Sequence, residues 1–210
     1  MLAHVLDAVL GTTTKVRILR ALLRLTSVVS GTEARRLAGV RSVKAMWASL
    51  DELTELGILQ REQTGRTHLY RVNREHHLAA PLAAVFEAEA SRAGELRKAL
   101  RSALEGAGLL DSVRSAVLYG SNARGEAGPR SDLDVLVVTR DEAAMPLVRD
   151  ALLDAASAIE NRLGTLLSAY VLPEPRVRER YQDGDPLMHT IEEEGREIFG
   201  TPFQELVRAW

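Results

Sequence analysis

Apolar side chains recur at helical spacing three times before residue 57. The spacing predicts a helix over 13–25, a short helix over 32–37 and a longer helix over 42–56. Side chains that can accept a hydrogen bond from the backbone stand at each start, namely Thr12 or Thr13, Ser30 and Ser42. The positions expected to face the core are Val16, Ile18, Leu19, Leu22, Leu23 and Leu25 in the first helix, and Val43, Met46, Leu50, Leu53 and Leu56 in the third.

The period changes to two after Gly57, which stands where a glycine commonly ends a helix. Residues 58–63 and 67–72 read as two short strands, and Thr64-Gly65-Arg66 between them predicts a hairpin turn. The pattern of residues 75–105 is helical again, with Gly94 as an expected interruption. Its apolar positions are Leu82, Val85, Phe86, Leu96, Leu100 and Leu104.

The second half of the chain, which begins after Gly106-Ala107-Gly108, predicts strands and helices in alternation. Strands are expected over 113–119, 133–138 and 165–172 because these runs are short, apolar and rich in Val and Leu. A helix is expected over 142–163, and a tail helix from Asp185 to Gly195 precedes a short strand or turn that ends at Gly200. The long helix has apolar positions at Leu147, Val148, Leu152, Leu153, Ala156 and Ile159.

Composition narrows the class of protein. The chain has no cysteine, which excludes disulfides, thiolate metal sites and a cysteine nucleophile. Only 4% of the residues are aromatic, so Leu, Val and Ala must fill the core. We see neither a signal peptide nor a long apolar run, so we expect a cytoplasmic protein without a membrane partner.

Charge differs between the two halves. Residues 1–75 hold 12 Lys and Arg against 7 Asp and Glu, whereas the rest of the chain holds 15 against 22. A basic front part and an acidic back part indicate two modules with different partners. Nucleic acid is the candidate partner of the basic part.

The candidate chemistry lies between residues 113 and 140. Asp132 and Asp134 are two apart beside a strand, so both carboxylates are expected on one side of the sheet. Mg²⁺ is commonly held by one or two carboxylates together with substrate phosphates. Gly120-Ser121, at the end of the preceding strand, lets backbone amides and a hydroxyl approach a polyphosphate closely. The combination indicates phosphoryl or nucleotidyl transfer.

This segment resembles the minimal nucleotidyltransferase family of the DNA polymerase β-like superfamily, over roughly residues 110–200. The resemblance rests on Gly120-Ser121, ten intervening residues and Asp132-Leu133-Asp134, with Ala123-Arg124-Gly125-Glu126-Ala127 and Ser131 also as in the family. It implies that Gly120, Ser121, Arg124 and Ser131 bind a nucleoside triphosphate such as ATP. It also implies that Asp132 and Asp134 are catalytic and hold Mg²⁺ or Mn²⁺.

One departure from that family leaves two functions open. Active members usually carry a third carboxylate on the next central strand, where this chain has Ser168 or Ala169, and Glu174 lies just past the strand. A working enzyme would move an NMP from NTP–Mg²⁺ to an acceptor hydroxyl, which the resemblance suggests lies on a protein, as in toxin–antitoxin pairs. A degenerate domain would instead be a nucleotide sensor in a transcriptional regulator. We treat the lone His189 as structural.

Residues 10–74 resemble the winged helix-turn-helix family. The resemblance rests on the order of elements, on Gly11 and Lys15 to Arg20, and on Leu50, Leu53, Gly57, Ile58 and Leu59. It implies a homodimer that regulates transcription by binding double-stranded DNA, with the third helix in the major groove and the hairpin, or wing, on the backbone. A protein-interaction scaffold that uses this part only to dimerise is the third function considered.

The expected DNA-facing residues belong to the third helix and the wing. The early positions of that helix expected to be exposed are Arg41, Ser42, Lys44, Ala45, Trp47 and Ser49, and the wing adds Arg61, Arg66 and Arg71. Trp47 is left open between a base contact and packing against the wing or a partner subunit. The whole chain is thus expected to be an α+β protein with a winged helix-turn-helix domain (1–75), a helical connector (76–107) and a mixed-sheet α/β nucleotidyltransferase domain (108–210).

Overall fold

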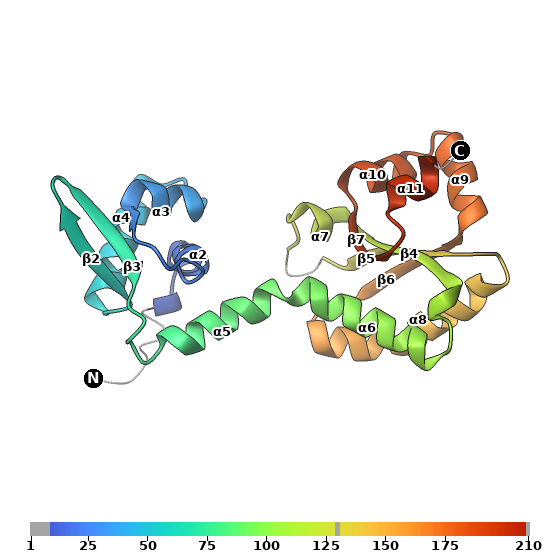
Figure 1. Cartoon of the computed structure of the whole chain (residues 1–210), viewed down its shortest axis with the longest axis horizontal. Coiled ribbons are helices and arrows are strands. Elements are labelled where there is room, and N and C mark those ends of the chain that lie inside the picture. The colour runs from blue at the N-terminus through green and yellow to red at the C-terminus, as the bar shows by residue number, and fades with distance from the viewer. Residues whose placement is uncertain (1–8, 129–130, 209–210) are drawn as a thin grey trace. The chain divides into compact units, whose positions relative to one another are not determined.

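The computed structural model describes residues 9–128 and 131–208 (Figure 1). Contacts divide the chain into two compact units, Met1–Ala90 and Ser91–Trp210. Within the described residues, no helix combines the length and the apolar character needed to cross a membrane. Arg130, a loop residue of the Gly120–Asp134 motif, lies outside the described residues.

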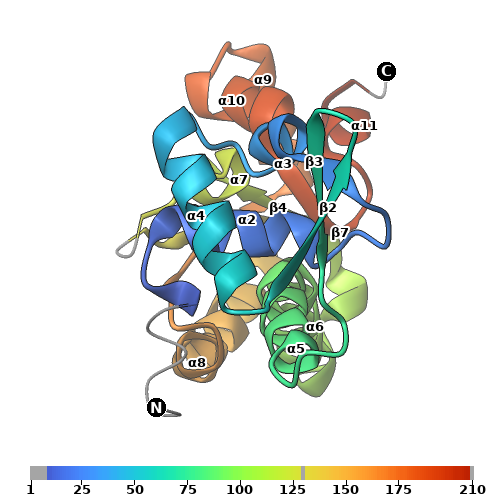
Figure 2. The ribbon, with the colours of Figure 1, turned by 90° about the vertical axis from the view of Figure 1, so that its left-hand side faces the viewer.

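The first unit combines helices with a small antiparallel sheet, whose strand order is β1-β3-β2 (Figure 2). Its elements are α2 (Thr13–Leu22), β1 (Val29–Ser30), α3 (Gly31–Leu37), α4 (Val43–Glu55), β2 (Leu59–Thr64), β3 (Thr67–Val72) and α5 (Ala79–Ala90). The helices and the hairpin expected from periodicity are therefore present. The two-residue β1 was not expected, because a strand that short has no period to detect.

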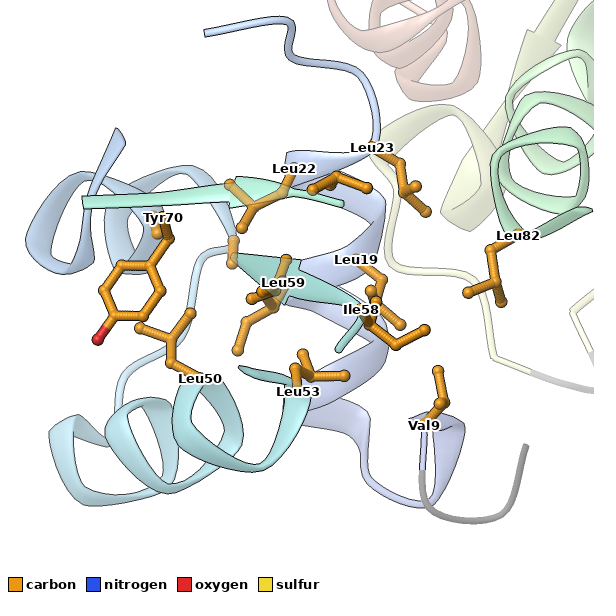
Figure 3. Packing of buried hydrophobic residues seen from close by; sticks show 14 of the residues in the cluster. Val9, Leu19, Leu22, Leu23, Leu50, Leu53, Ile58, Leu59, Tyr70 and Leu82 are labelled. Atoms are coloured by element: carbon orange, nitrogen blue, oxygen red, sulfur yellow. The ribbon is translucent and has the colours of Figure 1, made fainter. Parts of the chain in front are cut away.

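Three predicted caps start the helices of this unit. The hydroxyls of Thr12, Ser30 and Ser42 accept hydrogen bonds from backbone amides at the starts of α2, α3 and α4. Behind the caps, leucines of α2 and α4 meet the hairpin in one core (Figure 3). The labelled side chains include Leu19, Leu22, Leu50, Leu53, Ile58, Leu59 and Tyr70. Burying each such aliphatic side chain stabilises the unit by about 1.5–3 kcal/mol before entropy is counted.

Two predictions for α4 were wrong. Val43 was expected in the core but is 51% exposed, and Ser49 was expected on the surface but is only 6% exposed. The helix begins at Val43, so its first side chain lies beyond the rest of the buried stripe. Ser49 lies next to Leu50 and three positions after Met46, which places it at the edge of that stripe.

The helical segment 75–105 is divided between the two units. The break falls at Ser91, between α5 and α6 (Arg92–Gly106), and α6 runs through Gly94 without interruption. Leu82 and Phe86 of α5 pack in the core of the first unit, whereas the leucines of α6 pack in the second. Gly94 is tolerated because one glycine costs a helix only about 1 kcal/mol.

The second unit is built on a four-stranded mixed sheet of order β6-β5-β4-β7. β5 and β6 are parallel, and the other pairs are antiparallel. Beyond α6, the elements are η1 (Leu110–Ser112), β4 (Val113–Tyr119), α7 (Gly120–Arg124), β5 (Leu133–Thr139), α8 (Ala144–Leu163), β6 (Leu167–Pro173), α9 (Glu174–Gln182), α10 (Pro186–Glu194), β7 (Arg196–Gly200) and α11 (Phe203–Arg208). Helices α7, α9 and α11 were not predicted.

Helices cover both faces of this sheet (Figure 1). On one face, Leu133, Val135 and Val137 of β5 share a core with α6 and α8. On the other, Leu136 and Val138 share a core with α9, α10 and α11. Of the apolar positions named for the long helix, Leu147 and Leu153 of α8 are 58% and 72% exposed, because the sheet contacts only a narrow stripe of that helix.

Candidate functional site

The candidate site begins with a row of three residues across the central strands. Asp134 of β5 is in register with Tyr119 at the end of β4 and with Ser168 of β6. Side chains alternate along a strand, so Asp134 shares a face with Leu136 and Val138. That is the face covered by α9, α10 and α11. Asp134 therefore lies at one end of this face, beyond the apolar core.

Gly120 brings the backbone of α7 against the Asp134 carboxylate. Its φ is +70°, a conformation that favours glycine. A Cβ on Gly120 would lie 2.6 Å from Oδ2 of Asp134. Only glycine fits this approach, so the structure brings the Gly-Ser turn and the second aspartate of the motif together.

Asn122 ties the other aspartate to the same turn. Its Nδ2 donates a hydrogen bond of 2.6 Å to the backbone carbonyl of Asp132. The bond joins α7 to the start of β5 and positions Asp132 beside Asp134. Sequence reasoning missed Asn122, whose only signal was its place directly after Gly120-Ser121.

The charges of Asp132 and Asp134 favour the binding of a cation between them. Burial raises the pKa of Asp134, the neighbouring charge of Asp132 raises it further, and the Ser168 hydroxyl opposes the shift by hydrogen bonding to the carboxylate. Burial also raises the pKa of Tyr119, with smaller effects from Asp134 and Tyr170. Two repelling carboxylates, one of them partly desolvated, offer hard oxygen ligands whose repulsion a divalent cation would relieve.

Two carboxylates are all that this site supplies among the described residues, which contain no cluster of three or more metal-ligating side chains. Ser168 takes the position on β6 beside Asp134. Glu174 begins α9, just past the far end of β6 and six residues after Ser168, which is about 20 Å by strand geometry. It is paired there with Arg114 and Arg178. Glu174 therefore cannot replace the third carboxylate.

Two of the remaining predicted nucleotide-binding residues, Arg124 and Ser131, already have partners. Arg124 Nε donates to Glu126 Oε2 at 2.8 Å, and Nη1 donates to Glu194 Oε2 at 3.0 Å. The Ser131 hydroxyl accepts from the Gly128 amide at 2.9 Å, which closes the loop before β5. Ser121 is half-buried on the first turn of α7.

The sequence did not reveal a hydrogen-bonded group of side chains near Ser168, formed by Tyr170, Arg180 and Asp185. Tyr170 of β6 lies two residues beyond Ser168 and accepts a hydrogen bond from Arg180 of α9. Arg180 Nε also donates to Asp185 Oδ2 at 2.6 Å, and Asp185 caps α10. His189 of α10 stacks on Tyr181, with ring centroids 4.5 Å apart, which agrees with the structural role expected for it.

In the first unit, the predicted DNA-facing residues differ in their surroundings. Lys44 and Arg66 are exposed and make no ion pair with a described residue. Arg61 pairs with Asp51 at 3.0 Å, and Arg71 pairs with Glu62 at 3.1 Å. The Ser42 hydroxyl caps α4.

Trp47 packs within its own unit and remains 39% exposed. Its ring centroid lies 6.5 Å from that of Tyr70 in β3, and its indole occupies the space where a Cβ on Gly31 would be. The indole thus contacts the base of the wing, one of the alternatives left open for it, and keeps one edge in solvent.

Comparison with known proteins finds a family match within the second unit. Residues 95–194 match the family model of the nucleotidyltransferase domain. The match spans Gly120, both aspartates and Glu194, so the candidate site lies inside the matched segment. It supports nucleotidyl transfer as the general chemistry of this part of the chain. No curated protein matches the chain.

Solved structures resemble the chain only distantly. A toxin–antitoxin structure with AMP-PNP is 13% identical to this chain, with a TM-score of 0.34. The alignment covers 53% of this chain and 80% of the other. A mutant of the MntA–HpeT toxin–antitoxin is 14% identical over 55% and 80%, with a TM-score of 0.36. TrmBL2, an archaeal chromatin protein with a novel mode of DNA binding, is 17% identical over 86% and 72%, with a TM-score of 0.27. At these values the resemblance does not extend to activity or partners.

Proposed function

We propose that the nucleotidyltransferase domain transfers a nucleoside monophosphate from an NTP, held with Mg²⁺ or Mn²⁺, to an acceptor hydroxyl on a protein. The observation that carries the proposal is the approach of Gly120 to Asp134, where a Cβ would lie 2.6 Å from the carboxylate. This approach brings the backbone of a Gly-Ser turn and a carboxylate pair to one point, which is what a metal–triphosphate complex requires.

Each residue of the site has a distinct part in this proposal. Asp132 and Asp134 hold the metal, and the amides and hydroxyl of Gly120-Ser121 bind the triphosphate. Ser131 closes the loop that leads from α7 to β5. Asn122 keeps Asp132 in place through its backbone carbonyl. Arg124 binds phosphate once its carboxylate partners have been displaced.

The reaction breaks a phosphoanhydride bond of the NTP and forms a phosphodiester bond to the acceptor. The acceptor oxygen forms a bond to the α-phosphorus, and the bond from that phosphorus to the oxygen bridging to the β-phosphate breaks. Pyrophosphate leaves with the bonding electrons, and the acceptor proton passes to water. A bound divalent cation supplies charge neutralisation and alignment of the reacting oxygens. The backbone of α7 and the two aspartates supply the position of the phosphates.

A protein acceptor is favoured by the exposure of the site. Asp132 and Ser168 are both exposed, so this end of the sheet is open to a large acceptor. The motif resemblance also suggests a protein acceptor, as in toxin–antitoxin pairs. Labelling experiments with each NTP would identify both the nucleotide and the acceptor.

A second function, nucleotide sensing without turnover, is favoured by Ser168. A hydroxyl beside Asp134 can hydrogen bond, but it gives a metal ion no negative charge and is too weak a base to take the acceptor proton as a carboxylate would. In this reading the domain binds an NTP and changes the DNA affinity of the first unit, which requires the nucleotide to bind the two DNA-binding states differently.

Ser168→Asp separates these two functions. If the wild type is a slow enzyme, the added carboxylate is expected to raise the rate of nucleotidyl transfer by about 10- to 100-fold, within the range of general base catalysis. The rate is measured with labelled NTP under single-turnover conditions, and Ser168→Asn is the control of similar size without charge. A wild type and a Ser168→Asp variant that both bind NTP and both transfer nothing would favour the sensor.

We further propose that the first unit is a winged helix-turn-helix that binds duplex DNA as a homodimer at a near-palindromic site and regulates transcription. Support comes from the exposed start of α4, which carries Lys44 and Trp47, and from Arg66 at the tip of the hairpin. Lys and Arg contact phosphates, and apolar side chains such as Val43 can contact a thymine methyl group. Arg61 and Arg71 form ion pairs with Asp51 and Glu62, so they offer DNA less net positive charge.

Replacing Lys44, Arg61 and Arg66 with Ala is expected to weaken DNA binding and to reduce the slope of log K against log salt by about 0.9 for each phosphate that the variant no longer neutralises. Lys44 and Arg66 should account for most of the change, because Asp51 already neutralises Arg61. Affinities at several salt concentrations measure the slope. The control is Arg24→Ala, an exposed cation at the base of the hairpin, where Arg74 binds the carbonyls of Leu23 and Leu25. Equal slopes in the triple variant and the wild type would remove the DNA-facing assignment.

A further inference from the structure

Helix α10 is fixed at both of its ends to residues of the candidate site. At its start, Asp185 pairs with Arg180, which also donates to Tyr170 beside the Asp134 row. At its end, Glu194 pairs with Arg124 of α7. The helix thus connects the strand of Ser168 with the turn that carries Gly120. The second of these contacts bears directly on how a nucleotide binds.

Arg124 is held by two carboxylates from different elements. Glu126, in the loop after α7, accepts from Nε, and Glu194 of α10 accepts from Nη1. The side chains of Arg124 and Glu194 are 38% and 39% exposed, and that of Glu126 is 67% exposed. Exposed pairs of this kind contribute little to stability. They can therefore exchange for a stronger partner at small cost.

The position of Arg124 makes a phosphate that stronger partner. Arg124 lies one helical turn after Gly120, so the two residues share a side of α7. The backbone of Gly120 abuts the Asp134 carboxylate. Guanidinium binds phosphate in a bidentate geometry that a single carboxylate oxygen on each nitrogen does not provide. A triphosphate placed between Gly120 and the aspartates would approach this guanidinium.

The charges around α7 also indicate that the carboxylates there oppose nucleotide binding. Besides the two aspartates of the site, Glu126 and Glu194 bring two further carboxylates to α7, where both pair with Arg124. A triphosphate adds further negative charge. Each carboxylate that engages Arg124 therefore opposes nucleotide binding twice, by occupying the guanidinium and by repelling the phosphates.

We propose that Glu194, together with Glu126, competes with the nucleotide for Arg124 and so sets the nucleotide affinity of this domain. The inference rests on the proposed function and extends it to a regulatory contact. When nucleotide binds, Arg124 exchanges its carboxylate partners for phosphate oxygens, and the end of α10 is released from α7. Nucleotide occupancy is thereby transmitted to α10.

The test is equilibrium binding of Mg²⁺ with the non-hydrolysable α,β-methylene analogues of ATP, CTP, GTP and UTP to the full chain. Glu194→Gln is expected to bind the preferred analogue about two- to five-fold more tightly, and Glu194→Gln with Glu126→Gln about ten-fold more tightly, as the range for exposed ion pairs implies. Glu105→Gln is the matched control. It removes an exposed carboxylate paired with Arg101 on α6, at the opposite face of the sheet, and should leave affinity unchanged.

An Arg124→Ala background separates competition for Arg124 from general repulsion. If Glu194 acts by occupying Arg124, Glu194→Gln should give little gain in that background. An equal gain in both backgrounds, or no gain in either, would overturn the inference. A contact that only fixes α10 to α7 predicts a lower melting temperature for Glu194→Gln without tighter binding, which would also overturn it.

The wild type and the aspartate variant distinguish the two levels of the proposal. If the wild type binds an analogue, Asp132→Ala with Asp134→Ala abolishes that binding, and Glu194→Gln changes nothing, only this inference fails. If the wild type binds none of the four analogues with Mg²⁺ or Mn²⁺, the proposed function fails and this inference fails with it.

Discussion

Asp132→Ala together with Asp134→Ala is expected to weaken metal-dependent nucleotide binding by at least about 100-fold, because loss of even an outer-shell partner of a metal ligand typically costs about 10- to 100-fold. Asp134 of β5 lies against the Gly120 turn, and Asp132, directly before β5, is joined to the same turn by Asn122. Without the two aspartates the cation loses both of its protein carboxylate ligands. The triphosphate then loses the positive charge of that cation, which would hold it in the site.

The same variant should stay folded and be at least as stable as the wild type. The pKa of Asp134 is raised by burial and by Asp132, so the charged form costs stability above that pKa. Removing the charge relieves this cost, which is the usual trade between stability and function at a site. Thermal unfolding at neutral pH measures the stability of the variant, and titration with Mg²⁺ and each NTP measures its nucleotide affinity.

Asp150→Ala with Asp154→Ala is the matched control, because it removes two exposed carboxylates from α8, which covers the opposite face of the sheet. This control should bind nucleotide as the wild type does. Unchanged binding in the Asp132 and Asp134 variant would show that the aspartates hold no nucleotide–metal complex. A large fall in its melting temperature would instead assign the pair a structural role.

Gly120→Ala should have the second-largest effect, a loss of nucleotide affinity of about 10- to 100-fold, since displacing a group by about 1 Å can cost a site that much. The new methyl group would lie 2.6 Å from Oδ2 of Asp134, so either the carboxylate or the turn must move. The φ of +70° adds about 1–2 kcal/mol of backbone strain.

Gly125→Ala separates the strain from the collision. Gly125 ends the same helix with a φ of +75°, but nothing lies within 4 Å of its Cβ position. Both variants should lose similar stability, and only Gly120→Ala should lose nucleotide affinity. Equal losses of affinity in the two variants would mean that strain in α7, rather than contact with Asp134, governs binding.

Local pattern predicted much of the fold. The caps at Ser30 and Ser42, the hairpin around Gly65 and the three central strands of the second unit follow from signals within a few residues of each other. The burial of individual side chains was not predictable from local pattern, because it depends on which other elements pack against each helix. Val43 begins α4 beyond the stripe that packs on the core, and Leu153 lies on a side of α8 that the sheet does not reach.

The candidate site was predictable only where its residues are close in sequence. Gly120, Asp132 and Asp134 were found because the motif spans fifteen residues. Glu194 was missed because it is 70 residues from its partner Arg124, and an ion pair between exposed side chains leaves no local pattern. For the same reason the sequence did not reveal that Asp51 neutralises Arg61.

The most direct test of nucleotidyl transfer is incubation of the full chain with each NTP labelled on the α-phosphate, with Mg²⁺ or Mn²⁺, alone and with cell lysate. The account predicts label on a protein, released pyrophosphate, and loss of both with Asp132→Ala and Asp134→Ala. The labelled protein would identify the acceptor, and the NTP that labels it would identify the nucleotide. Label that persists in the double variant, or no transfer by either the wild type or Ser168→Asp, would contradict the claim that these aspartates serve a nucleotidyltransferase.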